Sequence, residues 1–330
     1  MADESKKIKL QDDELVPVLR NEFINGTAFP ADVFFRLTEN YYILVAHAGD
    51  KANIKELKLS DEVNFLYVKK SEFKSFVGQS ISIAGVLMNR VGLSIDKKAI
   101  FISKASSSVS KELSQLGITH EALEHAKFVA NNIKTLIELK SDIFAIMELF
   151  GSLSLGQLDY AMAVSMVSVA LAKNMGWNMN ATLEKISLGC LLQDVGMKEF
   201  PKSLILKPRH ELTNDERSLF ETHPFRSAEI LRSMPSISDE VISIAYEHHE
   251  NAIATGYPRR IKDLKMNPLA KVVALSNAFC ELTIKSGNNA NPRTAAKAIE
   301  YLDVTMGQPF NEQAFKALRV IFNVPEVQAA

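Results

Sequence analysis

The sequence predicts an α+β protein, in which a small α/β accessory domain precedes an all-α helical domain. Two observations lead to this prediction. Over residues 14–104, short apolar runs alternate with turn residues, a pattern typical of strands. From about residue 110 onwards, apolar residues recur at three- and four-residue steps, the spacing of helices that bury one face. A chain of 330 residues, 47% of them hydrophobic, is long and apolar enough to form a buried core in one large domain or two smaller ones.

The first 104 residues are predicted to form a flexible N-terminus and a small accessory domain. Residues 1–13 are polar, and we expect a flexible N-terminus. In the accessory domain, 14–104, apolar runs predict strands and one stretch predicts a short helix. The strands are expected at Tyr41–Ala46, Val63–Val68, Ser80–Val86 and Ala99–Ile102, and the helix at Lys70–Val77.

A polar hinge at Ser106-Ser107-Ser108 is expected to introduce linker helices over 105–152 and then an all-α domain over 153–325. Caps and apolar spacing set the helix limits, including a capping box at Thr213–Glu216. Helices are expected at Ile143–Phe150, Leu158–Lys173, Thr182–Leu192, Asn214–His223, Asp239–His248, Asn267–Leu282, Asn291–Met306 and Glu312–Phe322.

Composition excludes several classes of function. The net charge of −1 gives no field that attracts nucleic acid or anionic lipid. Two cysteines are too few for a disulfide framework, which fits a reducing cytoplasm. The N-terminus has no apolar stretch of the signal-peptide kind, and the longest apolar run, Ala161–Ala172, is too short to span a bilayer. We therefore expect a cytoplasmic protein without membrane insertion.

Three of the seven histidines fall close together near the ends of predicted helices. His223, His248 and His249 are accompanied by Asp194, which follows another predicted helix. Imidazole and carboxylate are the ligands that borderline transition metals prefer. The alternative interpretation is a helix end at which the rings of His248 and His249 are both hydrogen bonded, because polar groups in a core need partners.

A series of short motifs surrounds these histidines in a fixed order. They are Leu204-Ile205-Leu206-Lys207-Pro208, Leu212-Thr213, Glu216, His223-Pro224, Ala228-Glu229-Ile230-Leu231, His248-His249-Glu250, Gly256-Tyr257-Pro258 and Ala270-Lys271-Val272-Val273. The series resembles the HD-GYP family, a branch of the HD superfamily of metal-dependent phosphohydrolases. The resemblance implies an all-α fold with two or three metal ions, typically iron or manganese, that hydrolyses cyclic di-GMP. It also implies a diguanylate-cyclase-type partner domain, met through the Gly256-Tyr257-Pro258 loop.

The sequence departs from this family at one of its metal positions. The resemblance places the ligands of the first metal at Val164, Gln193, Asp194 and Asn277, and those of the second metal at Asp194, His223, His248 and His249. Three of the first set are neither histidine nor carboxylate, whereas the second set is complete. In addition, Met197 stands where the family has a phosphate-facing lysine.

These departures lead to the expectation of a degenerate HD-GYP-like signalling or scaffolding protein with little or no hydrolysis of cyclic di-GMP. We expect one transition-metal ion, iron, manganese or zinc, at the second set, with complete loss of metal as the alternative. Two rival functions remain: a phosphodiesterase with one metal ion, in which Asp194 is catalytic, and a sensor that binds cyclic di-GMP without cleaving it. Glu250 is expected to orient a histidine or to be solvated, and the loop of Gly256, Tyr257 and Pro258 to dock a partner.

Overall fold

The computed structural model describes residues 7–54, 57, 59–60, 62–139, 160–286, 289–307 and 309–325. The helix predicted at Ile143–Phe150 lies outside them. The N-terminal strands form one antiparallel sheet in the order β1-β4-β3-β5-β2. Its strands are β1 (Lys7–Lys9), β2 (Leu15–Leu19), β3 (Val33–Thr38), β4 (Tyr41–Ala46) and β5 (Phe65–Lys69). Two of these strands were predicted, but the flexible N-terminus is wrong for residues 7–13, because β1 pairs with β4.

Three long helices follow the sheet: α1 (Phe73–Met88), α2 (Ile95–Gln115) and α3 (His120–Leu139). The strands predicted at Ser80–Val86 and Ala99–Ile102 are therefore wrong. The buried residues of α1 include Phe73, Phe76, Val77, Ala84 and Met88, which share one helical face. The short apolar run at Ser80–Val86 resembles a strand by itself, but over the whole of α1 the apolar residues follow helical spacing.

The predicted serine hinge is also wrong, because Ser106-Ser107-Ser108 lies inside α2. Small side chains at buried positions allow neighbouring helices to approach closely, and Ser106 and Ser108 are fully buried. Ser107 donates a hydrogen bond of 2.8 Å to the buried carboxylate of Glu22, which also pairs with Lys111. The accessory-domain limit predicted at residue 104 thus falls within a helix that is tied to the segment between β2 and β3.

The remaining helices confirm most of the predicted helical region. They are α5 (Tyr160–Asn174), α6 (Asn180–Leu192), α7 (Lys202–Leu206), α8 (Asn214–Phe220), α9 (His223–Arg232), α10 (Asp239–Glu247), α11 (Pro268–Thr283), α12 (Ala295–Glu300) and α13 (Glu312–Ile321), with short 3-10 turns η4 (Val195–Glu199) and η5 (Arg209–Glu211). The capping box at Thr213 and the caps at Asn267 and Asn311 are present. The largest differences are that α8 ends at Phe220, and that α12 begins after Thr294, which caps it, and ends at Glu300.

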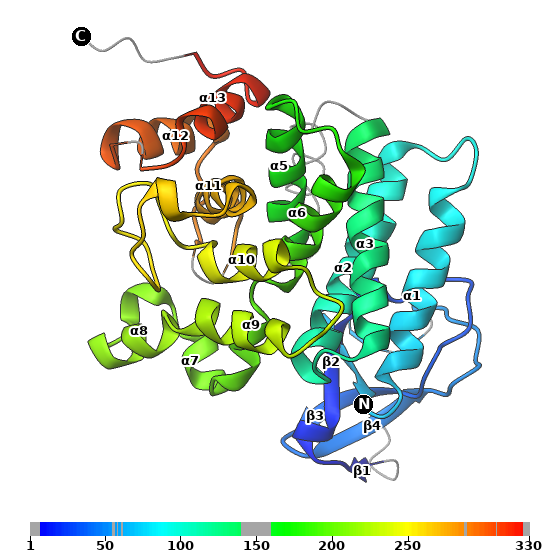
Figure 1. Cartoon of the computed structure of the whole chain (residues 1–330). Helices are drawn as coiled ribbons and strands as arrows, with labels where there is room; N and C mark the ends of the chain where they lie inside the picture. The colour runs from blue at the N-terminus through cyan, green and yellow to red at the C-terminus, as the bar shows by residue number, and fades with distance from the viewer. Residues whose placement is uncertain are drawn as a thin grey trace.

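The helices enclose one core that continues into the base of the sheet. In Figure 1 the sheet lies below α1–α3, and α5 and α6 stand between these helices and α9–α11. Helix α6 packs against α3, α5 and α10, and α11 packs against α5 and α10. This packing brings the C-terminal ends of α6 and α10, the start of α9 and the middle of α11 to one place. Among the residues that the structure describes, no helix is both long and apolar enough to cross a membrane.

Candidate metal centre

Two buried histidines face each other where α9 begins and α10 ends. His223 is the first residue of α9, so His223-Pro224 starts a helix instead of stopping one, and His248 follows α10. Their Nε2 atoms are 3.1 Å apart. Each Nδ1 lies 2.9 Å from a backbone carbonyl, of Phe220 and of Ala245 respectively, and donates its proton there. The Nε2 atoms of both rings therefore converge on one point.

Asp194 completes this point from the end of α6. Its Oδ1 lies 3.2 Å from His223 Nε2 and 3.5 Å from His248 Nε2. Burial favours the protonated carboxyl, but hydrogen bonds and charge interactions with the two histidines outweigh it and hold the pKa of Asp194 well below its usual range. The side chain of Asp194 is 44% exposed, whereas both histidines are buried. The carboxylate therefore forms the accessible side of the cluster.

His249 supplies a third imidazole. The ligand atoms of the three histidines all lie within 4.8 Å of one another. Burial is the largest cause that lowers the pKa of His249 well below its usual value. Burial also lowers the pKa of His223, despite the opposing effect of Asp194. His223 and His249 are therefore neutral at pH 7, the form that binds a metal. We call Asp194, His223, His248 and His249 the imidazole side.

The positions assigned to the first metal are joined by direct hydrogen bonds. Gln193 Nε2 donates to Asn277 Oδ1 at 3.2 Å and to Asp194 Oδ2 at 3.4 Å. Tyr160 donates its hydroxyl to the same Asn277 oxygen at 2.9 Å. Val164, one turn further along α5, is fully buried in the apolar core. We call Tyr160, Val164, Gln193 and Asn277 the amide side; it offers no imidazole and no carboxylate.

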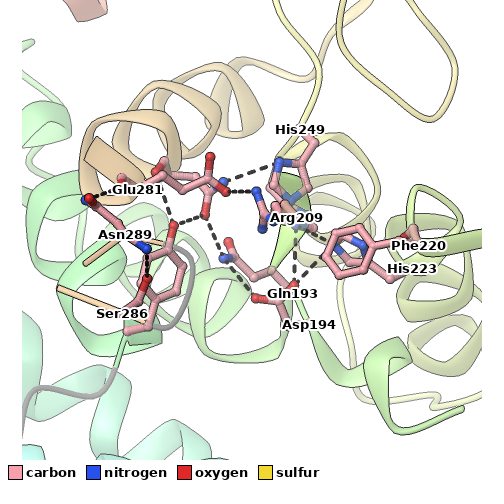
Figure 2. A network of polar contacts seen from close by, with 12 residues as sticks. Gln193, Asp194, Arg209, Phe220, His223, His249, Glu281, Ser286 and Asn289 are labelled. Atoms are coloured by element: carbon pink, nitrogen blue, oxygen red, sulfur yellow. Dashed lines mark hydrogen bonds and ion pairs between the residues drawn. The ribbon is translucent and has the colours of Figure 1, made fainter. Parts of the chain in front are cut away.

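The two sides touch at two places. Asn277 Nδ2 lies 3.4 Å from His249 Nδ1, and Gln193 reaches Asp194 as described above. Figure 2 shows Gln193 and Asp194 next to each other, with His223 beyond them. Within the described residues, the buried Oε1 of Gln193 has no hydrogen-bond partner. This amide oxygen is thus free to act as a metal ligand, but it carries no charge.

The loop after His249 covers that ring. Tyr257 stacks on His249 with ring centroids 4.5 Å apart and an interplanar angle of 22°. Gly256 permits this approach, because a Cβ atom at that position would lie 2.3 Å from the carbonyl oxygen of His249. Pro258 follows Tyr257 in the same turn. Tyr257 is therefore directed at the metal cluster and is only partly exposed. Docking of a partner through this loop stays a prediction.

Glu250 holds the same loop through the backbone that follows Pro258. It is buried, and its carboxylate accepts hydrogen bonds from the backbone N–H groups of Arg259 at 2.6 Å and Ile261 at 3.1 Å. The solvated alternative for Glu250 is wrong. The orienting of a histidine by Glu250 stays a prediction, and its observed contacts hold the loop that carries Tyr257.

The apolar surroundings of the site lie next to the 3-10 turn after Asp194. Met197 packs with Phe200, Leu204, Leu212 and Phe220 in a small cluster of its own, so this position brings no charge. Phe220 also touches the metal cluster, because its ring meets His223 edge to face with centroids 5.1 Å apart. Phe220, Tyr160, Arg209 and Glu281 also surround the cluster, and no motif in the sequence selected them as site residues.

The imidazole side fits a transition-metal ion. Two imidazole Nε2 atoms that face each other at 3.1 Å need a cation or a proton between them, because two lone pairs at this distance repel. A carboxylate oxygen and a third imidazole beside them complete a donor set typical of iron, manganese or zinc. The amide side does not fit a second ion, because its side chains are neutral and already bonded to each other.

Comparisons with known proteins agree on this region. The HD domain family matches residues 136–312. The chain is 28% identical over 162 residues to "Cyclic di-GMP phosphodiesterase PA4108" of Pseudomonas aeruginosa, which is 48% of this chain and 37% of that protein. It is 24% identical over 185 residues to a "Cyclic di-GMP phosphodiesterase" of Thermotoga maritima, 54% of this chain and 50% of that protein. The chain thus spans half or less of the length of these curated relatives.

A solved structure extends the similarity to the N-terminal region. It is that of Bd1817, a HDG"Y"P protein from Bdellovibrio bacteriovorus, with a TM-score of 0.71 and 20% sequence identity. The alignment covers 94% of this chain and 99% of that one. The sheet, α1–α3 and the helical region are therefore one recurring architecture, and at this identity the likeness concerns the fold alone.

Proposed function

Because the chain belongs to the HD-domain family, in its HD-GYP branch, we propose that it is a signalling protein with one transition-metal ion and little or no hydrolysis of cyclic di-GMP. The observation that carries this proposal is the direct hydrogen bond between Gln193 and Asn277. It occupies the place where the resemblance requires ligands for a first metal ion. The curated relatives named above are cyclic di-GMP phosphodiesterases, so the same ligand class is the first to test here.

Asp194, His223, His248 and His249 are the residues that would hold the ion. A divalent ion bound there supplies a Lewis acid that polarises a ligand oxygen. The protein holds the site ready by fixing the Nδ1 protons of His223 and His248 on backbone carbonyls and by stacking Tyr257 on His249. These contacts set which nitrogen faces the metal.

Hydrolysis should be weak because the chain supports only one ion at a site whose chemistry depends on two. Neutral amide oxygens bind divalent ions poorly compared with imidazole and carboxylate. The Asn277 oxygen already accepts hydrogen bonds from Gln193 and Tyr160 and would have to give them up before it could bind an ion. Met197 leaves the neighbouring turn without a cation that would stabilise charge on a phosphate.

The test is product formation from cyclic di-GMP, followed by chromatography under anaerobic conditions with iron, manganese or zinc. We expect wild-type turnover at background, equal to that of Asp194→Ala, while an active HD-GYP phosphodiesterase assayed in parallel gives product. Robust wild-type turnover that is abolished by Asp194→Ala would contradict the proposal. That result would instead establish a phosphodiesterase with one metal ion, for which the exposure of Asp194 provides access.

A further inference from the structure

An arginine lies beside the metal cluster without belonging to either side of it. Arg209, in η5, donates through Nη1 to Glu281 Oε1 at 2.6 Å. Its guanidinium lies over the ring of Phe220, 5.1 Å from the centroid. Phe220 in turn accepts the Nδ1 proton of His223 through its backbone carbonyl. In Figure 2 Arg209 lies between Glu281 and the histidines. One residue, Phe220, therefore contacts both Arg209 and the metal ligand His223.

The backbone around Arg209 is held in place. Its carbonyl oxygen accepts hydrogen bonds from the side chain of Arg217 at 3.3 Å and from the N–H of Leu212 at 3.4 Å. On the preceding side, Lys207 forms a 2.6 Å ion pair with Glu216 in the first turn of α8. The turn is thus fixed before and after the arginine, and the guanidinium is supported by an aromatic face. Such preorganisation reduces the entropy lost when a ligand binds.

Arg209 lies next to the histidines, on the side of Glu281 (Figure 2). The side chain of Arg209 is 40% exposed, so an incoming ligand can contact it. Asp194 and Glu281 give this region more negative than positive charge, and a divalent ion at the imidazole side reverses that balance. The metal-loaded site therefore attracts an anion towards Arg209.

We propose that Arg209 is the anion-binding residue of this site and contacts the phosphate oxygens of a ligand whose other side faces the metal. The planar guanidinium matches phosphate geometry, and its bonds to an anion are charge-assisted. Glu281 holds the same guanidinium and competes with the ligand for it. This inference rests on the proposed single-ion site and identifies the ligand by its phosphate group, whether as a monoester or a diester.

Inorganic phosphate is the probe, titrated calorimetrically into manganese-loaded protein from which free metal has been removed. We expect Arg209→Gln to weaken phosphate binding about tenfold or more, because one charge-assisted contact is lost. The phosphate affinity of Arg209→Lys should lie between those of wild type and Arg209→Gln, since lysine keeps the charge but loses the planar, two-pronged guanidinium. Glu281→Gln should bind phosphate more tightly than wild type, because the competing carboxylate is gone.

Arg226 offers a matched control. It pairs through Nη1 with Glu199 at 2.8 Å and lies over the ring of Phe200, 5.1 Å from the centroid, so its chemistry is that of Arg209 at another place. We expect Arg226→Gln to bind phosphate like wild type. Phosphate binding that is absent in wild type, or equal in wild type and Arg209→Gln, overturns the inference. If Arg209→Gln does not fold by circular dichroism, an unchanged affinity in Glu281→Gln overturns it.

The metal content of each sample, measured by elemental analysis, separates this inference from the proposed function. Phosphate binding that requires Arg209 in a protein with no bound metal supports the arginine and contradicts the single-ion site. A protein with one ion whose phosphate affinity ignores Arg209 contradicts the arginine alone. Hydrolysis of cyclic di-GMP bears only on the proposed function.

Discussion

The polar side chains on the two sides of the cluster have different hydrogen-bond partners. On the amide side, Gln193, Asn277 and Tyr160 bond to one another, and Val164 belongs to the apolar core. On the imidazole side, His223 and His248 each donate the Nδ1 proton to a backbone carbonyl, and their Nε2 atoms face each other. A buried acceptor without a donor is costly.

This difference shows how contacts can separate a group of side chains suited to a metal ion from one that is not. Gln193 and Asn277 satisfy each other directly. The histidines use backbone hydrogen bonds for orientation, and their Nε2 atoms converge. The predictions below either break this contrast or sharpen it, and they run from the largest expected effect to the smallest.

The largest effect is expected from His248→Gln. Removing one of the two facing imidazoles should reduce metal content from about one ion per chain to nearly none after gel filtration, because structural metal sites depend on each ligand. Elemental analysis gives the result. His210→Gln is the control, since the side chain of His210 is 77% exposed and lies outside the cluster. Equal metal content in His248→Gln and wild type would place the ion elsewhere.

The converse change should rebuild the amide side. Together, Val164→His, Gln193→His and Asn277→Asp replace neutral groups by two imidazoles and a carboxylate, and metal content should rise from about one towards two ions per chain. Elemental analysis is again the measurement, with Val164→Ile as the control, because isoleucine supplies no ligand atom. A folded triple variant that still holds one ion would show that more than ligand identity separates the sides.

A smaller effect concerns the loop that covers His249. Gly256→Ala forces a Cβ atom against the His249 carbonyl, which should lower the free energy of unfolding by about 3 kcal/mol and weaken metal binding. Gly78→Ala is the matched control. Gly78 lies inside α1 with nothing within 4 Å of an added Cβ, so alanine there should be neutral or slightly stabilising. Thermal unfolding with and without metal measures both, and equal melting temperatures would refute the tight contact.

The smallest effect is the pH dependence of the metal-free chain. The pKa values of His223 and His249 are lower in the folded protein than in the unfolded chain. As pH falls below about 6.5, the unfolded chain binds protons that the folded protein does not, so the free energy of unfolding decreases. Asp194, whose pKa is also lowered, contributes stability that is lost only in a more acidic range. Denaturant titrations at several pH values test this, and His249→Gln should flatten the upper range. A stability that rises on acidification from pH 7 to pH 5 would contradict it.

The sequence predicted the helical half and the ligand set far better than the surroundings of the site. Helix caps such as Thr213 and Asn267 are local signals, and His248-His249 forms an adjacent pair, so both can be seen without tertiary structure. The role of Arg209 cannot, because it depends on how α8 and α11 bring Phe220 and Glu281 to it. Ser106 and Ser108 were misjudged for the same reason: a small polar residue in a close helix contact looks like a hinge until its neighbours are known.

The central claim is that the imidazole side still binds a metal and the amide side does not. Elemental analysis of wild-type protein, reconstituted anaerobically with iron, manganese or zinc and then freed of loose metal, tests it most directly. We expect about one ion per chain. Two ions per chain would mean that Gln193 and Asn277 part to accept a metal, and none with any of the three metals would mean that the converging imidazoles are a purely structural arrangement. Either result would contradict the account.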